Sequence, residues 1–300
     1  MAAATDAVSI VVVADTQLMT RDHPDLFDVM TGHIIDIAAA EPVAMVLHVG
    51  DVVNDGGKDP GQYRTAARSL QRLTAHGLPL MIAPGNHDYD NELSHDRSLT
   101  QFRDAFGPLC ADTASATFEP EAYENSAAIV AGPNGDLGFL TLEFGPRADV
   151  LAWAHQVLTD RADIPFIVNT HSHLYVDGQR TRPGCAHHPR LYAGTRDGHD
   201  GEEVWQRLLR HHDNVLAVFS GHHVHGNVHH RIDHTEGGSP VLQAFQNWQS
   251  EDLGGAGRFR LVTVDLVRRL VRLRVVNPVT GRFEDDEGYE VTADLARAGR

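Results

Sequence analysis

The pentapeptide Pro84-Gly85-Asn86-His87-Asp88 follows directly after a short apolar run, residues 78–83, and places an amide, an imidazole and a carboxylate in three consecutive positions. An apolar run of this length is typical of a buried strand. In open α/β sheets, ligands bind at the carboxyl ends of the strands. Glycine adopts backbone conformations that other residues rarely reach, so Gly85 permits a sharp turn there. The stretch therefore predicts either a functional site at a strand end or a polar turn between two elements.

Four more apolar runs end in polar side chains of the same kinds. Continuous β-branched runs are typical of parallel strands that are buried on both faces. The predicted strands are 9–14, 43–49, 164–170 and 215–220; they end in Asp15-Thr16-Gln17, Gly50-Asp51, His171-Ser172-His173 and Gly221-His222-His223-Val224-His225-Gly226. Five strand ends thus carry potential ligands, and this repetition favours a functional site.

Helical segments separate these strands. Apolar residues at helical spacing predict helices at 25–40, 62–76, 99–106, 147–161 and 202–212. Residues 127–130 and 137–144 are expected to pair as a hairpin, because Asn134-Gly135 suits a tight turn. From Pro240 the chain alternates as antiparallel strands, most clearly over 258–266 and 268–276. The pattern predicts an α/β fold, and nothing in the tail indicates a separate domain.

The composition argues against some classes of partner. Lysine and arginine total 25 against 41 acidic residues, a formal charge of −16, so most of the surface repels a polyanion. Nucleic acid is therefore not expected as a partner unless metal ions locally reverse the sign. The 20 histidines are about three times an ordinary share, which favours a metal site.

The cysteine content and hydropathy bear on the cellular location. Cys110 and Cys185 are too few for a disulfide framework and fit reduced thiols in a cytosol. Residues 1–6 show no basic region followed by a long apolar core, and no later run approaches the ~18 apolar residues of a membrane span. We therefore expect a cytoplasmic protein with no membrane segment.

The side chains at the strand ends have a shared chemistry. Carboxylate, imidazole and amide oxygen suit Mn²⁺, Fe²⁺/Fe³⁺ or Zn²⁺ and disfavour a thiolate site. The inventory is large enough for two ions that share a carboxylate, and such a pair can hold an attacking hydroxide and neutralise a phosphoryl oxygen. Hydrolysis of a phosphate ester is the first expectation. The candidates are Asp15, Gln17, Asp51, Asn86, His87, His171 and the histidines of 222–225.

Taken in order, these motifs resemble the calcineurin-like metallophosphoesterases over roughly residues 8–230. Asp15-Thr16-Gln17 looks like the branch that has glutamine where most members have histidine, and so do Asp177-Gly178-Gln179-Arg180 and Gln246-Asn247-Trp248-Gln249. The resemblance implies a four-layer α/β/β/α sandwich of mixed sheets flanked by helices. It implies a single domain over 1–300, in which antiparallel strands at 240–290 complete the sandwich.

The resemblance also implies the metal ligands. Asp15 would bind the first ion, Asp51 would bridge both ions, and Asn86 and His171 would bind the second. Gln17 departs from the common histidine and is a poorer donor to a transition metal. It is expected either as a direct ligand or as a hydrogen-bond partner of a ligand or of the substrate.

The resemblance gives His87 and Asp88 catalytic roles. His87, next to a ligand but aimed at the substrate, would protonate the leaving group or stabilise the transition state. Asp88 would orient His87.

The histidine run departs from the family pattern Gly-His-x-His by one extra residue. Aligned from Gly221, the pattern places Val224 at a ligand position, where it cannot bind. Aligned from the other end, it keeps His223 and His225 as ligands and absorbs the extra residue as a bulge. In an extended segment residues two apart point the same way, so the second alignment predicts that His222 faces away.

The leading interpretation is a dinuclear metal-dependent phosphoesterase. It would hydrolyse a small-molecule phosphomonoester or phosphodiester by attack of a metal-bound hydroxide, with His87 assisting the leaving group. One alternative keeps the metals but uses them for non-phosphoester chemistry, such as iron-dependent redox or a biosynthetic step. Another is a non-catalytic metal-binding scaffold. The sequence leaves the substrate, the metal pair and the oligomeric state open.

Overall fold

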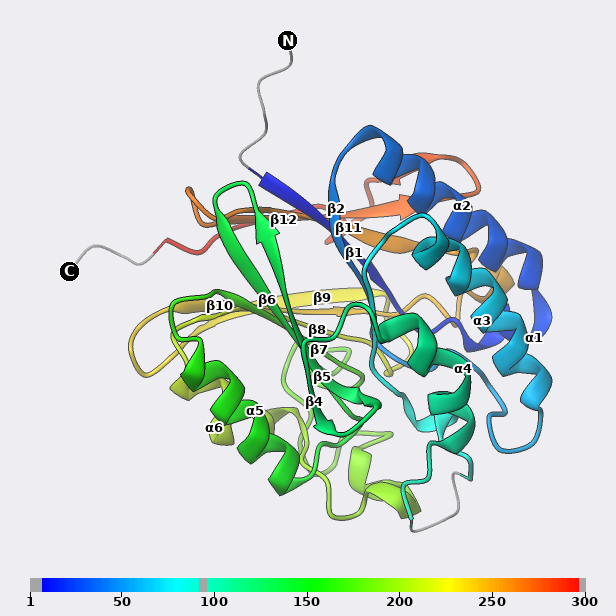
Figure 1. Ribbon diagram of the computed structural model, residues 1–300, viewed down its shortest axis with the longest axis horizontal. Coiled ribbons are helices and arrows are strands. Elements are labelled where there is room, and N and C mark those ends of the chain that lie inside the picture. The colour runs from blue at the N-terminus through cyan, green and yellow to red at the C-terminus, as the bar shows by residue number, and fades with distance from the viewer. Residues whose placement is uncertain (1–6, 92–95, 297–300) are drawn as a thin grey trace.

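Two seven-stranded sheets lie face to face and carry helices on their outer faces (Figure 1). This computed structural model describes residues 7–91 and 96–296. Residues 1–6, 92–95 and 297–300 lie outside the described ranges. Residues 1–6 are the segment that the sequence analysis searched for an export signal. The predicted α/β fold, a four-layer sandwich of mixed sheets flanked by helices, is confirmed.

The first sheet combines three parallel strands with antiparallel neighbours. Its strands are β1 (Ala7–Val13), β2 (Val43–His48), β3 (Leu80–Ile82), β11 (Phe259–Asp265), β12 (Leu270–Asn277), β13 (Arg282–Glu284) and β14 (Val291–Asp294). They lie in the order β13-β12-β11-β1-β2-β3, and β14 pairs with β12. β1, β2 and β3 are parallel, whereas β11 runs antiparallel to β1.

The second sheet contains the longer parallel run. Its strands are β4 (Ala116–Glu119), β5 (Ala122–Gly132), β6 (Gly135–Leu142), β7 (Phe166–Thr170), β8 (Val215–Ser220), β9 (Val228–His234) and β10 (Pro240–Gln246). They lie in the order β4-β5-β6-β7-β8-β10-β9, with β6, β7, β8 and β10 parallel. The expected hairpin is formed by β5 and β6.

Two features of this sheet differ from the expectation. β10 was expected in an antiparallel tail, but it runs parallel to β8 and leaves the sheet on the same side. β9 was not predicted. Its segment, Val-His-His-Arg-Ile-Asp-His, lies at the sheet edge, where every side chain of the strand is half-buried or exposed, so no apolar alternation is needed.

The helices connect the strands and cover the two outer faces (Figure 1). α2 to α4 lie on one side and α5 and α6 on the other. The helix predicted at 202–212 ends at Arg207 and is followed by a separate short 3-10 turn. The helices are α1 (Gln17–Asp22), α2 (Pro24–Ala40), α3 (Pro60–Ala75), α4 (Thr100–Cys110), α5 (Ala148–Asp160) and α6 (Gly201–Arg207), and the 3-10 turns are η1 (Asn86–Asp88), η2 (Pro189–Leu191), η3 (Ala193–Thr195), η4 (Leu209–His211) and η5 (Asp252–Gly255). None of the helices in the described ranges is long and apolar enough to cross a membrane.

Three apolar cores separate the four layers. In β1, Val11 and Val13 pack toward the helices, whereas Ile10 and Val12 pack between the sheets. Successive residues of a strand point to opposite faces, so a strand between two cores has to be apolar throughout. This requirement explains the unbroken apolar runs. A third core lies between the second sheet and α5 and α6.

Parallel strands end at one edge of a sheet, and here the edges of both sheets meet. The imidazole Nδ1 of His171, just after β7, donates to the carbonyl oxygen of Val49, just after β2, at 2.9 Å. The amide of Asn169 in β7 also donates to the carbonyl oxygen of His48, at 3.0 Å. The polar strand ends of both sheets are therefore tied together at one rim.

We expect Leu47→Ala to reduce the free energy of unfolding by about 2–5 kcal/mol, because the side chain fully buried between the sheets would leave a cavity. Urea unfolding followed by circular dichroism measures the change. Val267→Ala is the control: this side chain is 66% exposed, so its removal should change stability by less than about 0.5 kcal/mol. Equal losses in the two variants would contradict this account of the core.

Candidate functional site

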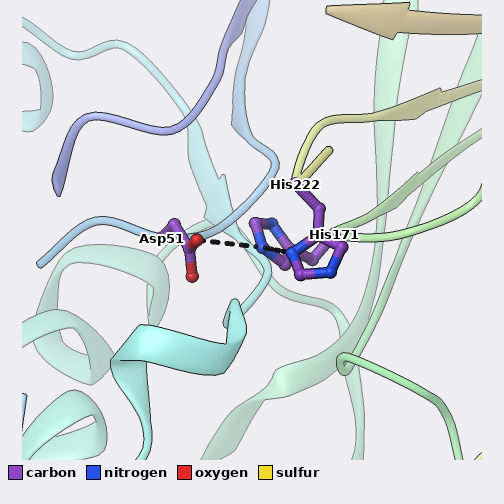
Figure 2. A group of neighbouring side chains, drawn as sticks. All are labelled: Asp51, His171 and His222. Atoms are coloured by element: carbon purple, nitrogen blue, oxygen red, sulfur yellow. Dashed lines mark hydrogen bonds and ion pairs between the residues drawn. The ribbon is translucent and has the colours of Figure 1, made fainter. Parts of the chain in front are cut away.

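Asp51, His171 and His222 converge at the rim (Figure 2). All three side chains are buried, and their ligand atoms lie within 4.8 Å of one another. Nε2 of His171 lies 3.2 Å from Oδ2 of Asp51 and 3.1 Å from Nδ1 of His222. Two elements of the second sheet and one of the first therefore meet at a single point.

The outer nitrogens of the two imidazoles fix which inner atoms face this point. Nδ1 of His171 donates to the carbonyl oxygen of Val49, and Nε2 of His222 donates to the carbonyl oxygen of His187 at 2.7 Å. A carbonyl oxygen only accepts, so both outer nitrogens carry hydrogen. A neutral His171 and a neutral His222 then direct lone pairs at each other and at the Asp51 carboxylate, and a cation between them is required.

A proton on His171 is one cation that fills this requirement. Burial lowers the pKa of His171, but the Asp51 carboxylate outweighs it and raises the pKa to about 9. Burial and the charge of His171 lower the pKa of His222 to about 3, so this ring is neutral. The proton occupies the place where imidazoles and carboxylates elsewhere bind metal ions.

Two carboxylates are buried side by side at the site. Asp15 accepts two hydrogen bonds from the backbone N of His222, at 3.0 and 3.2 Å. Asp51 accepts from the backbone N of His87 at 3.0 Å and from the amide of Gln17 at 3.1 Å. Burial raises the pKa of Asp15 to about 8; it opposes ionisation of Asp51 as well, but the imidazoles of His171 and His87 hold the pKa of Asp51 well below its usual range. Ionising both carboxylates in this setting requires added positive charge.

Two amide oxygens supply independent evidence that metal ions fit here. Oε1 of Gln17 and Oδ1 of Asn86 are buried and have no hydrogen-bond partner among the described residues. The amide nitrogen of Gln17 is engaged by Asp51 and by Gln249. A buried polar atom without a partner is costly, and a metal ion would satisfy it. The donor set of carboxylate, imidazole and amide oxygen suits Mn²⁺, Fe²⁺/Fe³⁺ or Zn²⁺.

The backbone is held in an uncommon conformation at three of these positions. Asp15, Asp51 and His222 have φ angles of 51°, 53° and 78°, in the left-handed region that few non-glycine residues adopt. Neighbouring glycines make the close packing feasible: a Cβ on Gly221 would lie 2.0 Å from Oδ2 of Asp15, and one on Gly85 would lie 2.1 Å from Oδ1 of Asp51. The chain therefore turns sharply at each strand end and aims the functional side chain into the rim.

The histidine run differs from the predicted register. The ligand-atom group contains His222 and neither His223 nor His225, so the prediction that His222 faces away is wrong. Nε2 of His223 lies 3.2 Å from the hydroxyl of Ser172, and His225 is exposed. The prediction assumed an extended segment, but the positive φ of His222 and the bond from the N of His223 to the O of Gly221 form a tight turn. The rule that residues two apart share a face does not hold there.

Asp88 also differs from the role expected for it. Its carboxylate accepts hydrogen bonds from the backbone N of Val52, Val53 and Gly85, at 2.9, 3.1 and 2.8 Å. It therefore ties the end of β2 to the end of β3 rather than orienting His87. Nδ1 of His87 instead donates to the carbonyl oxygen of Asn54 at 2.8 Å.

Gln249 is a site residue that the sequence reasoning did not single out. Its side-chain oxygen accepts from the amide of Gln17. The signal was Gln246-Asn247-Trp248-Gln249, which begins at the last residue of β10, and placing it required knowing that β10 is parallel to β8.

Comparisons with known proteins agree with this geometry. The model of the calcineurin-like phosphoesterase family matches residues 8–226. The uncharacterized protein YvnB of Bacillus subtilis is 27% identical over 294 residues, which is 95% of this chain but 21% of that relative. The DNA double-strand break repair protein Mre11 of Sulfolobus acidocaldarius is 32% identical over 100 residues, 30% of this chain and 26% of that protein. The chain thus spans about a fifth to a quarter of the length of these relatives.

Two solved structures share the fold at low sequence identity. A dimetal phosphatase from Danio rerio superposes with a TM-score of 0.60 at 14% identity, covering 96% of this chain and 99% of the other. GAP50, the anchor in the inner membrane complex of Plasmodium, has a TM-score of 0.53 at 13% identity, covering 98% of this chain and 90% of the other.

Gly85→Ala should weaken metal binding although it replaces none of the candidate ligands. The added Cβ would lie 2.1 Å from Oδ1 and 2.4 Å from the backbone N of Asp51, so this carboxylate has to move. We expect the affinity for Mn²⁺ to fall about 10- to 100-fold in calorimetric titration, as for changes in groups that support a ligand. Gly107→Ala in α4, where the nearest side-chain atom lies 3.6 Å from the added Cβ, should leave the affinity unchanged. Equal affinities in both variants would refute the proposed role of Asp51 at a metal.

Proposed function

The chain belongs to the calcineurin-like phosphoesterase family, and from its site geometry we propose that it hydrolyses a small-molecule phosphomonoester or phosphodiester at a dinuclear metal centre. The observation that carries the proposal is the convergence of buried donors from both sheets. Asp51, His171 and His222 meet within 4.8 Å, and the amide oxygens of Gln17 and Asn86 are buried without partners in the described ranges.

The proposed ligands form two groups, one for each ion, and Asp51 belongs to both groups. Asp15 and Gln17 would hold one ion, and Asn86, His171 and His222 would hold the other, with the Asp51 carboxylate shared. His223 and His225 are left out of the set, because His223 pairs with Ser172 and His225 is exposed. Ions held by these residues would supply activation of a water molecule and neutralisation of the phosphoryl oxygens.

His87 is placed to act on the leaving group. Its backbone N holds Asp51, and its ring Nδ1 is engaged by the carbonyl oxygen of Asn54. Proton transfer to the leaving oxygen is assigned to the imidazole of His87. Asp88 contributes indirectly, because it ties the loops that carry Asp51 and His87.

Charge supports a small ester as the substrate. The formal charge of −16 disfavours a nucleic acid over most of the surface. The alignments to Mre11 proteins cover 27% and 30% of this chain, and the DNA repair role is that of those proteins.

Cys110 and Cys185 are unpaired, which supports the proposal of a cytoplasmic location.

Asp51→Asn and Asn86→Ala should each abolish both metal uptake and phosphoester hydrolysis, because each removes a donor from the shared centre. Metal content by elemental analysis and release of p-nitrophenol from mono- and diesters measure the two effects, with circular dichroism as the check on folding. Asp104→Ala, an exposed carboxylate of α4, should match the unaltered protein. A folded Asp51→Asn protein with full activity would refute the proposal.

His87→Gln should slow hydrolysis in proportion to the basicity of the leaving group. We expect a loss of about 10²- to 10⁴-fold in kcat/KM for alkyl esters, which need a proton on the leaving oxygen, and a smaller loss for p-nitrophenyl esters. Metal content should stay the same, since no ligand is removed. An equal loss for both ester types would rule out leaving-group assistance by His87.

A further inference from the structure

Lys58 is the single lysine of the sequence; the other 24 basic residues are arginines. It lies in the loop between β2 and α3, seven residues after Asp51. Among the described residues its ammonium group forms no hydrogen bond or ion pair, and the side chain is exposed. A lysine ammonium is a compact, mobile point charge, and here it helps to lower the pKa of the neighbouring Asp55 without a direct bond to that carboxylate.

Lys58 and His87 line the same cavity. The cavity has a volume of about 340 Å³, and its walls are residues 54–58 together with His87, Asp90 and Asn91. Two loops form it, the one after β2 and the one after β3. The loops touch closely, since a Cβ on Gly57 would lie 1.8 Å from the carbonyl oxygen of Asp90 and one on Gly56 would lie 2.7 Å from that of His87. Glycine at both positions therefore maintains the contact between the two walls.

The two carboxylates in the cavity wall are engaged by protein donors. Asp55 accepts from the side-chain amides of Asn54 and Gln62, at 2.8 and 3.2 Å. Asp90 accepts from the backbone N of Thr100 and Gln101, at 2.7 and 3.0 Å. Both donors of Asp55 engage Oδ2, whereas Thr100 and Gln101 engage the two oxygens of Asp90. Lys58 is therefore the cation of the wall that no hydrogen bond or ion pair of the described residues engages.

We propose that Lys58 binds an anionic group on the alcohol portion of the substrate. The inference rests on the proposed function: with phosphorus at the metal centre and the leaving oxygen at His87, the alcohol portion would enter the cavity that His87 lines. The formal charge of the protein is −16, so most of its surface repels an anion. At this cavity an anionic group would instead meet the positive charge of Lys58. The substrate class is a phosphate ester whose leaving alcohol carries its own negative charge.

A matched pair of esters tests the preference. Phenyl phosphate and 4-carboxyphenyl phosphate share the scissile bond and differ in the charge of the leaving alcohol; their methyl diesters serve in the same way if diesters are the better substrates. We expect Lys58→Met to lower the ratio of kcat/KM for the carboxylated over the plain ester by about tenfold, the size of one charged hydrogen bond. Lys58→Arg, which keeps the charge, should recover most of the ratio.

Arg64→Met controls for long-range charge, because it removes an exposed cation six residues further along that does not line the cavity. In Arg64→Met the ratio of kcat/KM for the carboxylated over the plain ester should equal that of the unaltered protein. An unchanged ratio in Lys58→Met, or an equal fall in Arg64→Met, would overturn the inference.

Chemical labelling gives a second readout that requires neither metal nor turnover. An amine-reactive reagent modifies Lys58 as the single lysine side chain, and mass spectrometry of its peptide gives the rate. We expect 4-hydroxybenzoate, the anionic leaving alcohol, to slow the modification and phenol to have no effect. Equal rates with both would overturn the inference. Protection by 4-hydroxybenzoate in a protein that hydrolyses neither ester with Mn²⁺, Fe²⁺ or Zn²⁺ would overturn the proposed function and support the Lys58 site.

Discussion

The structure depends on how two adjacent buried carboxylates, Asp15 and Asp51, are compensated. Each lies at a strand end, almost wholly removed from water, and burial disfavours the charge on both. Backbone N–H groups of His222 and His87 supply part of the compensation. The rest has to come from positive charge between the sheets, and imidazoles and amide oxygens surround that point. The positive φ angles and the glycines beside the carboxylates are what this arrangement costs the backbone.

The site is made jointly by the two sheets. The first sheet supplies the proposed oxygen donors Asp15, Asp51 and Asn86 from the ends of β1, β2 and β3, and the second supplies the candidate imidazoles from the ends of β7 and β8. Neither sheet alone holds a complete donor set. The apolar core between the sheets and the bond from His171 to the carbonyl oxygen of Val49 therefore position the site as well as stabilise the fold. Any change that shifts one sheet against the other changes the distances among the donors.

Sequence reasoning predicted the fold well where one physical requirement decided the pattern. Strands between two cores must be apolar on both faces, so β1, β2, β7 and β8 were placed within about two residues. The edge strand β9 has no such requirement and was missed. The direction of β10 was also missed, because alternation alone does not distinguish parallel from antiparallel pairing.

At the site, too, sequence reasoning succeeded where strand topology decided the position and failed where local backbone geometry did. Asp15, Asp51, Asn86 and His171 were named because strand ends in parallel sheets meet, and that topology follows from the apolar runs. His222 was misplaced because its orientation depends on a positive φ, which no pattern of histidines reveals. Asp88 was predicted to orient His87 because the two residues are adjacent in the sequence. Its three backbone partners lie in loops whose packing emerges only in the folded chain.

The central proposal is that two metal ions would share the Asp51 carboxylate. Anomalous diffraction from crystals grown with Mn²⁺, recorded at the manganese absorption edge, tests it directly. The account predicts two peaks, one on either side of Asp51, with the amide oxygens of Gln17 and Asn86 each directed at one of them. An Asp51 carboxylate with no manganese beside it, in crystals saturated with the ion, would contradict the account.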